Sequence, residues 1–524
     1  MGRYVNPGIR NMKIDINDEF YVDKSMLIAL LNEKIETMDR FICVSRPRRF
    51  GKTMAANMIA AYYSKGCDSH EIFSDLKISK DPSFEEYINK YTVIKLDLNG
   101  AITNGQGLSI AQYYDRNVVP ELIELYPDVD FSDIKTLTDA LIEINAATSE
   151  RFVFIIDEYD IPFREEKYLP ELKDYYRFLV SLFKSSVTNQ TIALAYLTGI
   201  LPIIKEKTQS GLNNFTEYTM VDAFRMAPYM GFTEDEVKSL ATQSGMAFDE
   251  LNKWYDGYKL EGEKIYSPKS IIDAVTDHKC DGYWTQTCSY KALMDCITLG
   301  FEGLEKDVIN LITGANVDVE TRLYLNNLTF KDKNDVFTYL IHRGYLGYNY
   351  SDKTCFIPNY ELLLEWINAI EDTSDYKGVS ALIKDSKKLL EATWNGDEEA
   401  VAEGVAKAHR EACSILGYNN EGSFQSDIHL AYYYAKSYYT IVNELPAGKG
   451  FADCAFIPYK PDVPAIIIEL KKDDTVENAI DQIKERKYPE VLEKYKDNLL
   501  LVAISYDSKT KEHFCRIEKA KCAG

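Results

Sequence analysis

The sequence has no run of apolar residues long enough to cross a membrane as a helix, and no apolar leader follows its first residues. Its ten cysteines form no Cys-x-x-Cys pair and no cluster with histidine, which argues against a cysteine-based metal site. It also has no tandem repeat and no low-complexity tract. We therefore expect a globular, cytoplasmic protein that contacts no membrane and keeps its cysteines reduced.

The sequence also lacks an excess of basic residues. It has 60 Lys and Arg against 82 Asp and Glu, a net charge of -22, whereas proteins that bind nucleic acid usually present a basic face. The acidic excess lies in the N-terminal and middle regions, and the C-terminal region is nearly balanced. We therefore expect a nucleic-acid substrate to bind only one face of the protein, or to bind an assembled or ATP-switched state of it. A homo-oligomer is one possible assembled state.

The strongest motif is a short loop between an apolar run and a helix-forming run. The run Phe41–Val44 predicts a strand, and the loop Ser45–Thr53 ends in Gly-Lys-Thr. In a P-loop, backbone N–H groups cradle the phosphates of ATP, Lys52 reaches the β- and γ-phosphates, and the Thr53 hydroxyl holds Mg²⁺. Arg46 stands where the strict motif has glycine, so a surface turn is the alternative. The residues predicted to contact the nucleotide here are Arg49, Phe50, Gly51, Lys52 and Thr53.

Two further apolar runs end in polar residues that suit the same site. Phe152–Ile156 is followed by Asp157 and Glu158, a Walker B pattern in which Asp157 binds Mg²⁺ and Glu158 orients and deprotonates the attacking water. An ordinary polar strand end is the alternative. A third run ends at Thr198, which we expect to sense the γ-phosphate, and Val93–Leu98 supplies one more strand. Strands separated by helices predict a parallel α/β sheet that binds ligands at the carboxyl ends of its strands.

A second constellation lies near the C-terminus. Asp453 is on an alternating strand, and Ala465–Ile468 predicts a buried strand that ends in Glu469-Leu-Lys471. Glu469 and Lys471 share a face because strand side chains alternate. Carboxylates on paired strands can hold Mg²⁺ or Mn²⁺ beside a scissile phosphate, while the lysine orients or deprotonates the water. This is the PD-(D/E)XK nuclease pattern, and a salt bridge between Glu469 and a nearby lysine is the alternative.

Two aromatic groups have a simpler interpretation. Trp254–Tyr258 surrounds a glycine, and a tyrosine-rich stripe runs over Tyr432–Tyr439. We expect both groups to pack in hydrophobic cores, and stacking of the tyrosines on single-stranded nucleic acid is the alternative.

On these residues the chain resembles the bacterial proteins that join an AAA-ATPase-like domain to a C-terminal PD-(D/E)XK nuclease-superfamily domain. The resemblance implies an α/β fold with a P-loop NTPase (ASCE/AAA-like) parallel sheet in residues 1–226, a mainly helical lid or middle domain in 227–375, and an α/β restriction-endonuclease-like domain in 376–524. It also implies Glu444 as a third acidic residue of the nuclease site. The matching segments are Tyr21–Ser25, Arg46–Thr53, Ile156–Pro162, Thr198–Ile200, Leu212–Asn214, Gly231–Val237, Trp254–Tyr258, Glu444–Asp453, Glu469–Lys471 and Gln482–Ile483.

Together the motifs predict an ATP-binding and ATP-hydrolysing protein coupled to a Mg-dependent nuclease, with DNA favoured over RNA as the substrate. A regulatory signalling ATPase, whose nuclease-like domain binds a partner or nucleic acid without cleavage, is the alternative. Intact acidic residues at both sites favour the enzyme. The predicted catalytic residues are Glu158, Asp453, Glu469 and Lys471, and the predicted metal ligands are Thr53, Asp157, Glu444, Asp453 and Glu469.

Overall fold

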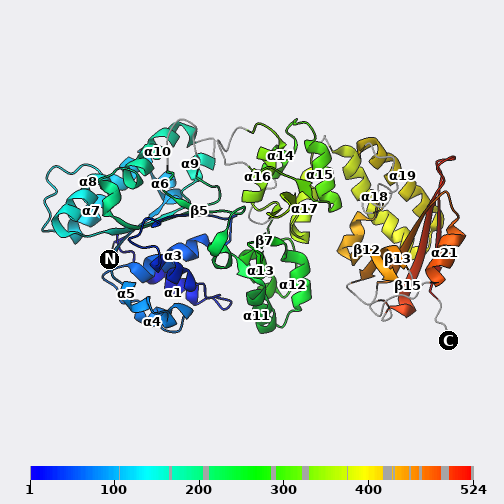
Figure 1. Cartoon of the computed structure of the whole chain (residues 1–524), viewed down its shortest axis with the longest axis horizontal. Coiled ribbons are helices and arrows are strands. Elements are labelled where there is room, and N and C mark those ends of the chain that lie inside the picture. The colour runs from blue at the N-terminus through cyan, green and yellow to red at the C-terminus, as the bar shows by residue number, and fades with distance from the viewer. Residues whose placement is uncertain are drawn as a thin grey trace. The chain divides into compact units, whose positions relative to one another are not determined.

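The computed structural model divides into two compact units (Figure 1). The first comprises Met1–Cys296 and Asn316–Glu365, and the second comprises Ile297–Ala315 and Trp366–Gly524. This division does not test the predicted boundary after residue 226, so the three-domain organisation stays a prediction. Across the described ranges, no helix is both long enough and apolar enough to span a bilayer. The structure describes residues 2–105, 107–164, 168–203, 212–284, 291–321, 330–373, 376–416, 428, 431–447, 450–458, 463–485, 492 and 495–520.

The first unit contains the predicted parallel α/β sheet. Its five strands lie in the order β2-β3-β4-β1-β5, and every neighbouring pair is parallel. All residues of β1, β3 and β4 are buried, as expected for strands covered on both faces. The register pairs Asp157 with both Asp97 and Thr198, so the polar carboxyl ends meet at one edge. The strands are β1 (Phe41–Ser45), β2 (Thr92–Asp97), β3 (Phe152–Asp157), β4 (Ile192–Gly199) and β5 (Thr216–Tyr218).

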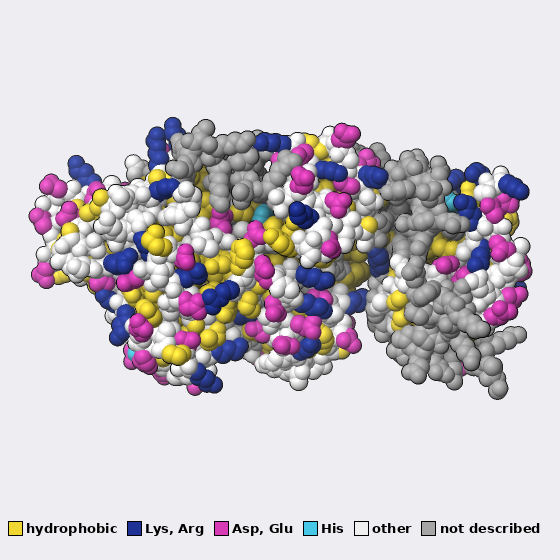
Figure 2. All heavy atoms as spheres, viewed as in Figure 1, with side chains coloured by type: hydrophobic (Ala, Val, Ile, Leu, Met, Phe, Trp, Pro, Cys, Tyr) yellow, Lys and Arg dark blue, Asp and Glu magenta, His cyan; other side chains and the backbone are white. Residues whose placement is uncertain are grey.

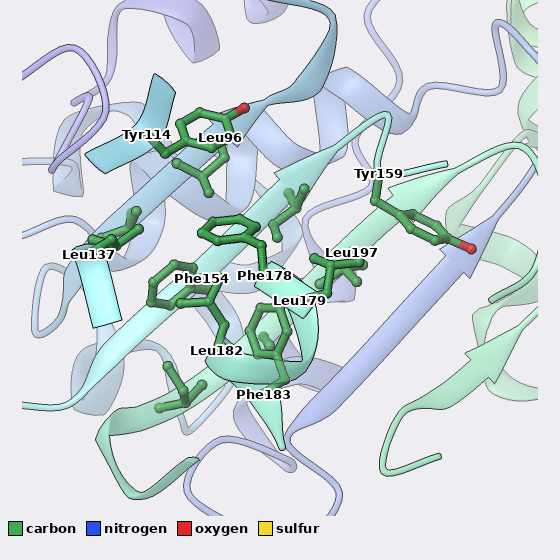
Figure 3. Packing of buried hydrophobic residues seen from close by; sticks show 14 of the residues in the cluster. Leu96, Tyr114, Leu137, Phe154, Tyr159, Phe178, Leu179, Leu182, Phe183 and Leu197 are labelled. Atoms are coloured by element: carbon green, nitrogen blue, oxygen red, sulfur yellow. The ribbon is translucent and has the colours of Figure 1, made fainter. Parts of the chain in front are cut away.

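Helices cover both faces of this sheet, each over its own hydrophobic core. Alternate strand residues such as Phe154 and Ile155 enter opposite cores, because strand side chains alternate. Figure 3 shows Phe154 packed among Phe178, Leu182 and Phe183 of α10. On this face lie α6 (Leu98–Asn104), α7 (Ile110–Leu125), α8 (Leu137–Thr148) and α10 (Leu169–Phe183). On the other face lie α1 (Arg10–Ile16), α2 (Met26–Asn32), α3 (Lys52–Tyr63), α4 (His70–Phe73) and α5 (Phe84–Tyr87).

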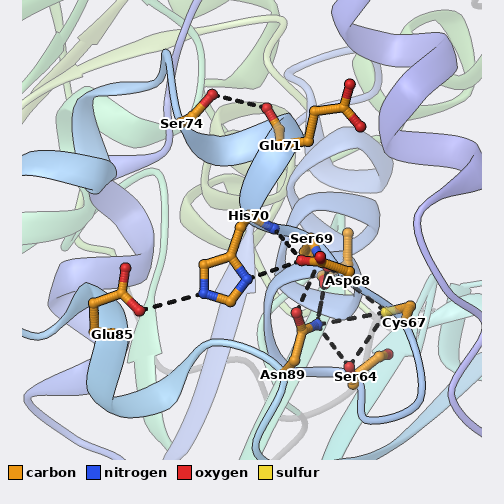
Figure 4. A network of polar contacts seen from close by, with 10 residues as sticks. Ser64, Cys67, Asp68, Ser69, His70, Glu71, Ser74, Glu85 and Asn89 are labelled. Atoms are coloured by element: carbon orange, nitrogen blue, oxygen red, sulfur yellow. Dashed lines mark hydrogen bonds and ion pairs between the residues drawn. The ribbon is translucent and has the colours of Figure 1, made fainter.

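A polar network holds the segment that follows α3 (Figure 4). The Asn89 side chain donates to the carbonyl of Ser64 at 2.7 Å and to the hydroxyl of Ser69 at 2.9 Å, and it accepts the Ser69 backbone N–H at 2.9 Å. His70 Nδ1 lies 2.9 Å from a carboxylate oxygen of Asp68, and this contact raises the pKa of the imidazole. The network fixes the C-terminal end of the helix whose first residue is Lys52.

The remainder of the first unit is mainly helical, with two small antiparallel sheets in the orders β6-β8-β7 and β10-β11-β9. A capping box between Thr233 and Glu236 starts α11, and Gly245 ends it in the left-handed conformation. The helices are α9 (Ile161–Arg164), α11 (Glu234–Ser244), α12 (Phe248–Tyr255), α13 (Pro268–Asp277), α14 (Lys291–Ile297), α16 (Lys333–His342) and α17 (Tyr360–Glu371). The last residue of α14 and the second half of α17, from Trp366, belong to the second unit. The strands are β6 (Phe232–Thr233), β7 (Tyr258–Leu260), β8 (Glu263–Tyr266), β9 (Val317–Asp318), β10 (Gly347–Asn349) and β11 (Thr354–Phe356). Short 3-10 helices are η1 (Lys77–Lys80), η3 (Thr188–Thr191) and η4 (Phe224–Tyr229).

The second unit contains the predicted C-terminal α/β fold. Its sheet has the order β12-β13-β14-β15-β16, in which β14 and β15 are parallel and the other pairs are antiparallel. A parallel pair needs a crossover connection, and α21 supplies it by packing Ile480 and Ile483 on the sheet. The strands are β12 (Tyr439–Ala447), β13 (Gly450–Pro458), β14 (Ala465–Lys472), β15 (Leu499–Tyr506) and β16 (His513–Lys519). The helices are α15 (Leu304–Thr313), α18 (Lys377–Asn395), α19 (Glu398–Leu416), α21 (Val476–Glu485), η5 (Tyr433–Ser437) and η6 (Lys496–Asn498).

Both aromatic groups contribute to packing. Tyr255 and Tyr258 are buried in the first unit, and Tyr432 and Tyr439 are buried in the second. The Tyr432 hydroxyl lies 2.8 Å from the hydroxyl of Thr393 within this core. The expected packing is confirmed for these four tyrosines.

Two buried carboxylates lie one turn apart on α17. Glu361 and Glu365 are each 1% exposed. Glu361 accepts hydrogen bonds from the Ser270 hydroxyl at 2.8 Å and from the Trp284 backbone N–H at 2.7 Å. Among the described residues, Oε2 of Glu365 has no hydrogen-bond partner. Burial raises the pKa of both carboxyl groups to about 7, so ionising them destabilises the folded state.

Replacing Glu365 by glutamine is expected to stabilise the protein above pH 7. Because the carboxyl pKa rises from 4.5 in the unfolded chain to about 7 on folding, wild type loses stability as the pH increases across that window. Glutamine carries no charge at any pH, so the variant avoids a cost of about 3 kcal/mol at pH 8. Thermal unfolding from pH 5 to 8.5 measures the effect, with the exposed Glu399→Gln as the control. A Tm difference that does not change with pH contradicts the expectation.

Candidate functional site

The P-loop connects β1 to α3 through two residues in the left-handed conformation. Arg49 has a φ of 67°, which is costly for a residue with a Cβ, and Gly51 has a φ of 82° at the N-cap of α3. Phe50 is buried between them, and its ring meets the Tyr258 ring edge-on at 5.5 Å. This contact fixes the loop against the helical part of the first unit.

The loop forms one wall of a cavity of about 840 Å³, within the size range of small-molecule sites. The cavity wall mixes cationic, acidic and aromatic side chains, of which the cations and the rings suit a polyanionic ligand with an aromatic base. The cavity therefore leaves space beside the P-loop for a ligand. Its wall includes Tyr21, Lys24, Arg48, Arg49, Phe50, Gly51, Lys52, Thr53, Asp97, Glu158, Arg164, Phe232 and Lys269.

Lys52 is buried at the start of α3 and turns back over the loop. Its Nζ donates to the carbonyl oxygens of Arg46 at 3.1 Å and Pro47 at 2.8 Å. Burial lowers its pKa, although Glu158 and two other carboxylates nearby act in the opposite direction. Across the described residues, no carboxylate lies within ion-pair distance of Lys52. The ammonium group is thus held by neutral carbonyls, which an anionic ligand in the cavity would outcompete.

The two predicted Mg²⁺ ligands of this site are in contact. Thr53 Oγ1 donates to Asp157 Oδ2 at 2.7 Å, and Asp157 Oδ1 accepts the Glu158 backbone N–H at 3.0 Å. Asp157 is 5% exposed, and burial raises its pKa while the Thr53 hydrogen bond opposes that shift. A hydroxyl and a carboxylate are hard oxygen donors, so these residues fit Mg²⁺.

The predicted base, Glu158, is held by an arginine. Glu158 has a φ of 55°, and its Oε2 lies 3.1 Å from Nη2 of Arg164. The same guanidinium lies 3.2 Å from Asp160, a buried carboxylate that also accepts the Leu201 backbone N–H at 3.0 Å. Arg164 could not be singled out from the sequence, because a cation six residues after Glu158 carries no recognisable spacing signal.

Two other predicted or noted residues lie near this edge but outside the described cavity wall. Thr198 pairs with Asp157 in the sheet register, but the described residues of the cavity wall do not include it. Its role as a γ-phosphate sensor stays a prediction. Arg46 is completely buried and donates to the carbonyls of Ser45 at 2.8 Å and Tyr218 at 3.1 Å, so it braces β1 against β5.

Two segments that carry the family resemblance meet at the cavity. Lys24 Nζ lies 2.5 Å from Glu236 Oε2 and donates to the Pro228 carbonyl at 2.7 Å. Glu236 is also the third residue of α11, and its side chain completes the capping box with Thr233. One ion pair therefore ties the N-terminal segment of the cavity wall to the start of α11.

In the second unit, the register of β12, β13 and β14 aligns the three predicted acidic positions. Cys454 pairs with Asn443 on one side and with Ile468 on the other, both antiparallel. Continuing this register by one residue places Asp453 opposite both Glu444 and Glu469. Directly opposed residues share one face of a sheet, so Asp453 and Glu469 do not point in opposite directions. The Glu444 side chain lies outside the described residues.

Two of the predicted nuclease residues, Glu469 and Lys471, contact each other, and Asp453 contacts the backbone between them. Glu469 is 2% exposed and accepts from Lys471 Nζ at 3.2 Å, so the salt bridge considered as an alternative is present. Asp453 Oδ2 accepts the Leu470 backbone N–H at 2.7 Å. Within the described part of the chain, no group of three His, Cys, Asp or Glu side chains is placed to hold a metal ion. Two carboxylates beside a lysine nevertheless fit a hard divalent cation, and metal binding here stays a prediction.

The described residues around this site do not form a strongly basic surface. Lys484 on α21 pairs with Glu518 at 2.9 Å, as a solvated helix face would, and Lys472 is exposed. Figure 2 shows basic and acidic side chains interspersed over the described surface in view. Arg486 and Lys487, the other basic residues noted in this region, lie outside the described residues.

Comparisons with known proteins match two separate parts of the chain. Residues 8–208 match a family model described as "Predicted AAA-ATPase", and residues 419–514 match one described as "PD-(D/E)XK nuclease superfamily". A protein of Azotobacter chroococcum mcd 1, named "Uncharacterized protein in vnfD 5'region", is 28% identical over 306 residues. That alignment covers 54% of this chain and 53% of the relative, so the chain spans about half of the relative's length.

Proposed function

Because the chain joins an AAA-ATPase-like region to a PD-(D/E)XK nuclease-superfamily region, we propose that it hydrolyses ATP at the first and cleaves nucleic acid at the second. The observation that carries the ATPase half is the hydrogen bond to Asp157 from Thr53, which lines the cavity beside Lys52. The alignment of Asp453 with Glu469, next to Lys471, supports the nuclease half.

At the ATPase site, each residue has a role that follows from its chemistry. Lys52 gives up its hydrogen bonds to the two loop carbonyls and donates instead to the β- and γ-phosphate oxygens. The loop around these oxygens is shaped by Arg49, Phe50 and Gly51. Thr53 and Asp157 hold Mg²⁺, which when bound neutralises charge on the phosphate oxygens. Glu158 accepts a proton from the water that attacks the γ-phosphorus as the bond to the bridging oxygen breaks.

At the nuclease site, Asp453 and Glu469 hold a divalent cation, with Glu444 as a third ligand by resemblance. Mg²⁺ or Mn²⁺, when bound, polarises the scissile phosphate. Lys471 leaves Glu469 and orients or deprotonates the attacking water. DNA is favoured over RNA as the substrate.

A second candidate function is supported by the Lys471–Glu469 ion pair, because this pair neutralises the predicted metal ligand from within the chain. In that case the protein is a regulatory ATPase, and its second unit binds a partner or nucleic acid without cleavage.

One experiment separates the two functions. ATP hydrolysis and cleavage of single- and double-stranded DNA and RNA are measured in the same preparation, with Mg²⁺ or Mn²⁺ and with or without ATP. Hydrolysis accompanied by cleavage of any substrate supports the proposal. Hydrolysis without cleavage supports the regulatory ATPase, and the absence of both activities contradicts the proposal altogether.

A further inference from the structure

Arg164 lies at the end of α9, on the wall of the P-loop cavity, and it bridges two carboxylates. Its side chain is 5% exposed. One nitrogen of the guanidinium lies 3.1 Å from Glu158, and the other lies 3.2 Å from Asp160. A planar, always charged guanidinium can hold two anions at once in this way.

The two carboxylates are not equivalent. Asp160 is 1% exposed and also accepts the Leu201 backbone N–H, so it is fixed within the unit. Glu158 is 25% exposed and lies on the cavity wall. Arg164 can therefore release Glu158 while Asp160 keeps the guanidinium in place.

The cavity also places Arg164 near a second cation. Arg164 and Lys52 line the same wall, and the positive charge of Arg164 contributes to lowering the Lys52 pKa. The carboxylates of Glu158, Asp160 and Asp157 offset these two charges, so an anion gains the attraction of both cations only when Glu158 moves away. A carboxylate engaged by a guanidinium, in turn, is not free to accept a hydrogen bond from water in the same direction.

We propose that Arg164 detects the γ-phosphate of ATP: it pairs with Glu158 before ATP binds and pairs with the γ-phosphate afterwards, which releases Glu158 toward the attacking water. This inference rests on the proposed ATPase function. ADP has no γ-phosphate, so it leaves the Arg164–Glu158 pair in place. Arg164 thus couples the activation of Glu158 to the presence of a triphosphate.

A purely structural role for Arg164 predicts something different. If the guanidinium only braced Asp160 and Glu158, its loss would disturb the site equally for ADP and for a triphosphate. Comparing the two nucleotides therefore separates detection of the γ-phosphate from bracing.

The test measures binding of AMP-PNP and ADP, with Mg²⁺, by calorimetry. Arg164→Gln is expected to weaken AMP-PNP binding by about tenfold or more while ADP affinity changes little, because charge-assisted hydrogen bonds to phosphate are among the strong ones. Arg164→Lys is expected to recover part of that affinity. Arg177→Gln, which changes an exposed arginine on α10, is the matched control. Equal weakening of AMP-PNP and ADP binding by Arg164→Gln overturns the inference.

A double-mutant cycle adds a sharper criterion. Glu158→Gln removes the competitor of the γ-phosphate, so it is expected to tighten AMP-PNP binding several-fold without affecting ADP. That gain is expected to shrink or vanish in the Glu158→Gln/Arg164→Gln double variant. Loss of repulsion between Glu158 and the phosphate would also tighten binding, but it would persist in the double variant, and full persistence overturns the inference. If wild type binds neither nucleotide, the proposed ATPase function fails instead.

Discussion

Replacing Lys52 by alanine is expected to abolish detectable ATP hydrolysis and to weaken nucleotide binding by about tenfold to a hundredfold. Lys52 is a buried cation that, among the described residues, is held by the Arg46 and Pro47 carbonyls, and it lines the cavity next to Thr53. Its charge is therefore available to phosphate oxygens, and charge-assisted hydrogen bonds of this kind contribute about 1.5–3 kcal/mol each. Loss of a cation that stabilises charge in the transition state typically lowers kcat by about 10²–10³.

Phosphate release and fluorescent-nucleotide binding measure these effects. Lys13→Ala removes an exposed lysine on α1 and serves as the matched control, with circular dichroism to verify folding. A Lys52→Ala variant that hydrolyses ATP at the wild-type rate would show that the P-loop motif is a structural turn.

Replacing Asp453 by asparagine is expected to reduce nucleic-acid cleavage by about a hundredfold or more and to leave ATP hydrolysis unchanged. Asparagine keeps an oxygen that can accept the Leu470 backbone N–H, so the contact between β13 and β14 is preserved. The variant loses the negative charge that a divalent cation requires, and even a supporting residue of a metal site is commonly worth about 10–100-fold. ATP hydrolysis depends on residues of the other compact unit, so it is expected to persist.

Cleavage of labelled oligonucleotides with Mn²⁺, alongside phosphate release in the same preparation, tests this expectation. Asp481→Asn changes an exposed aspartate on α21 of the same unit and is the control. Cleavage that survives in Asp453→Asn would locate the activity elsewhere or in a contaminant.

Much of the ATPase fold could be predicted from local patterns. The apolar runs that became β1, β3 and β4 are buried along their whole length, and such runs are typical of parallel strands. The polar residues at their ends came together at one edge because parallel strands end on the same side. The contact between Thr53 and Asp157 follows from this rule, although the two residues are far apart in the sequence.

Other features depend on long-range packing that no local pattern encodes. The position of β4 between β1 and β3 is set by tertiary structure, and so is the burial of Arg46 between β1 and β5. Arg164 contacts Glu158 and Asp160 within its own short segment, but its place on the cavity wall beside the P-loop is set by tertiary structure. In the second unit, spacing alone could suggest that Asp453 and Glu469 share a face, but only the strand register could align them.

The proposed protein holds divalent cations beside phosphate at two separate sites in one chain. The most direct test is a crystal structure with Mn²⁺ and AMP-PNP, in which anomalous scattering locates the metal. We expect one manganese beside Thr53 and Asp157, with the nucleotide over the P-loop, and another between Asp453 and Glu469. If manganese is missing from either pair of residues, at a manganese concentration that saturates the active protein, the proposal of two metal sites is contradicted.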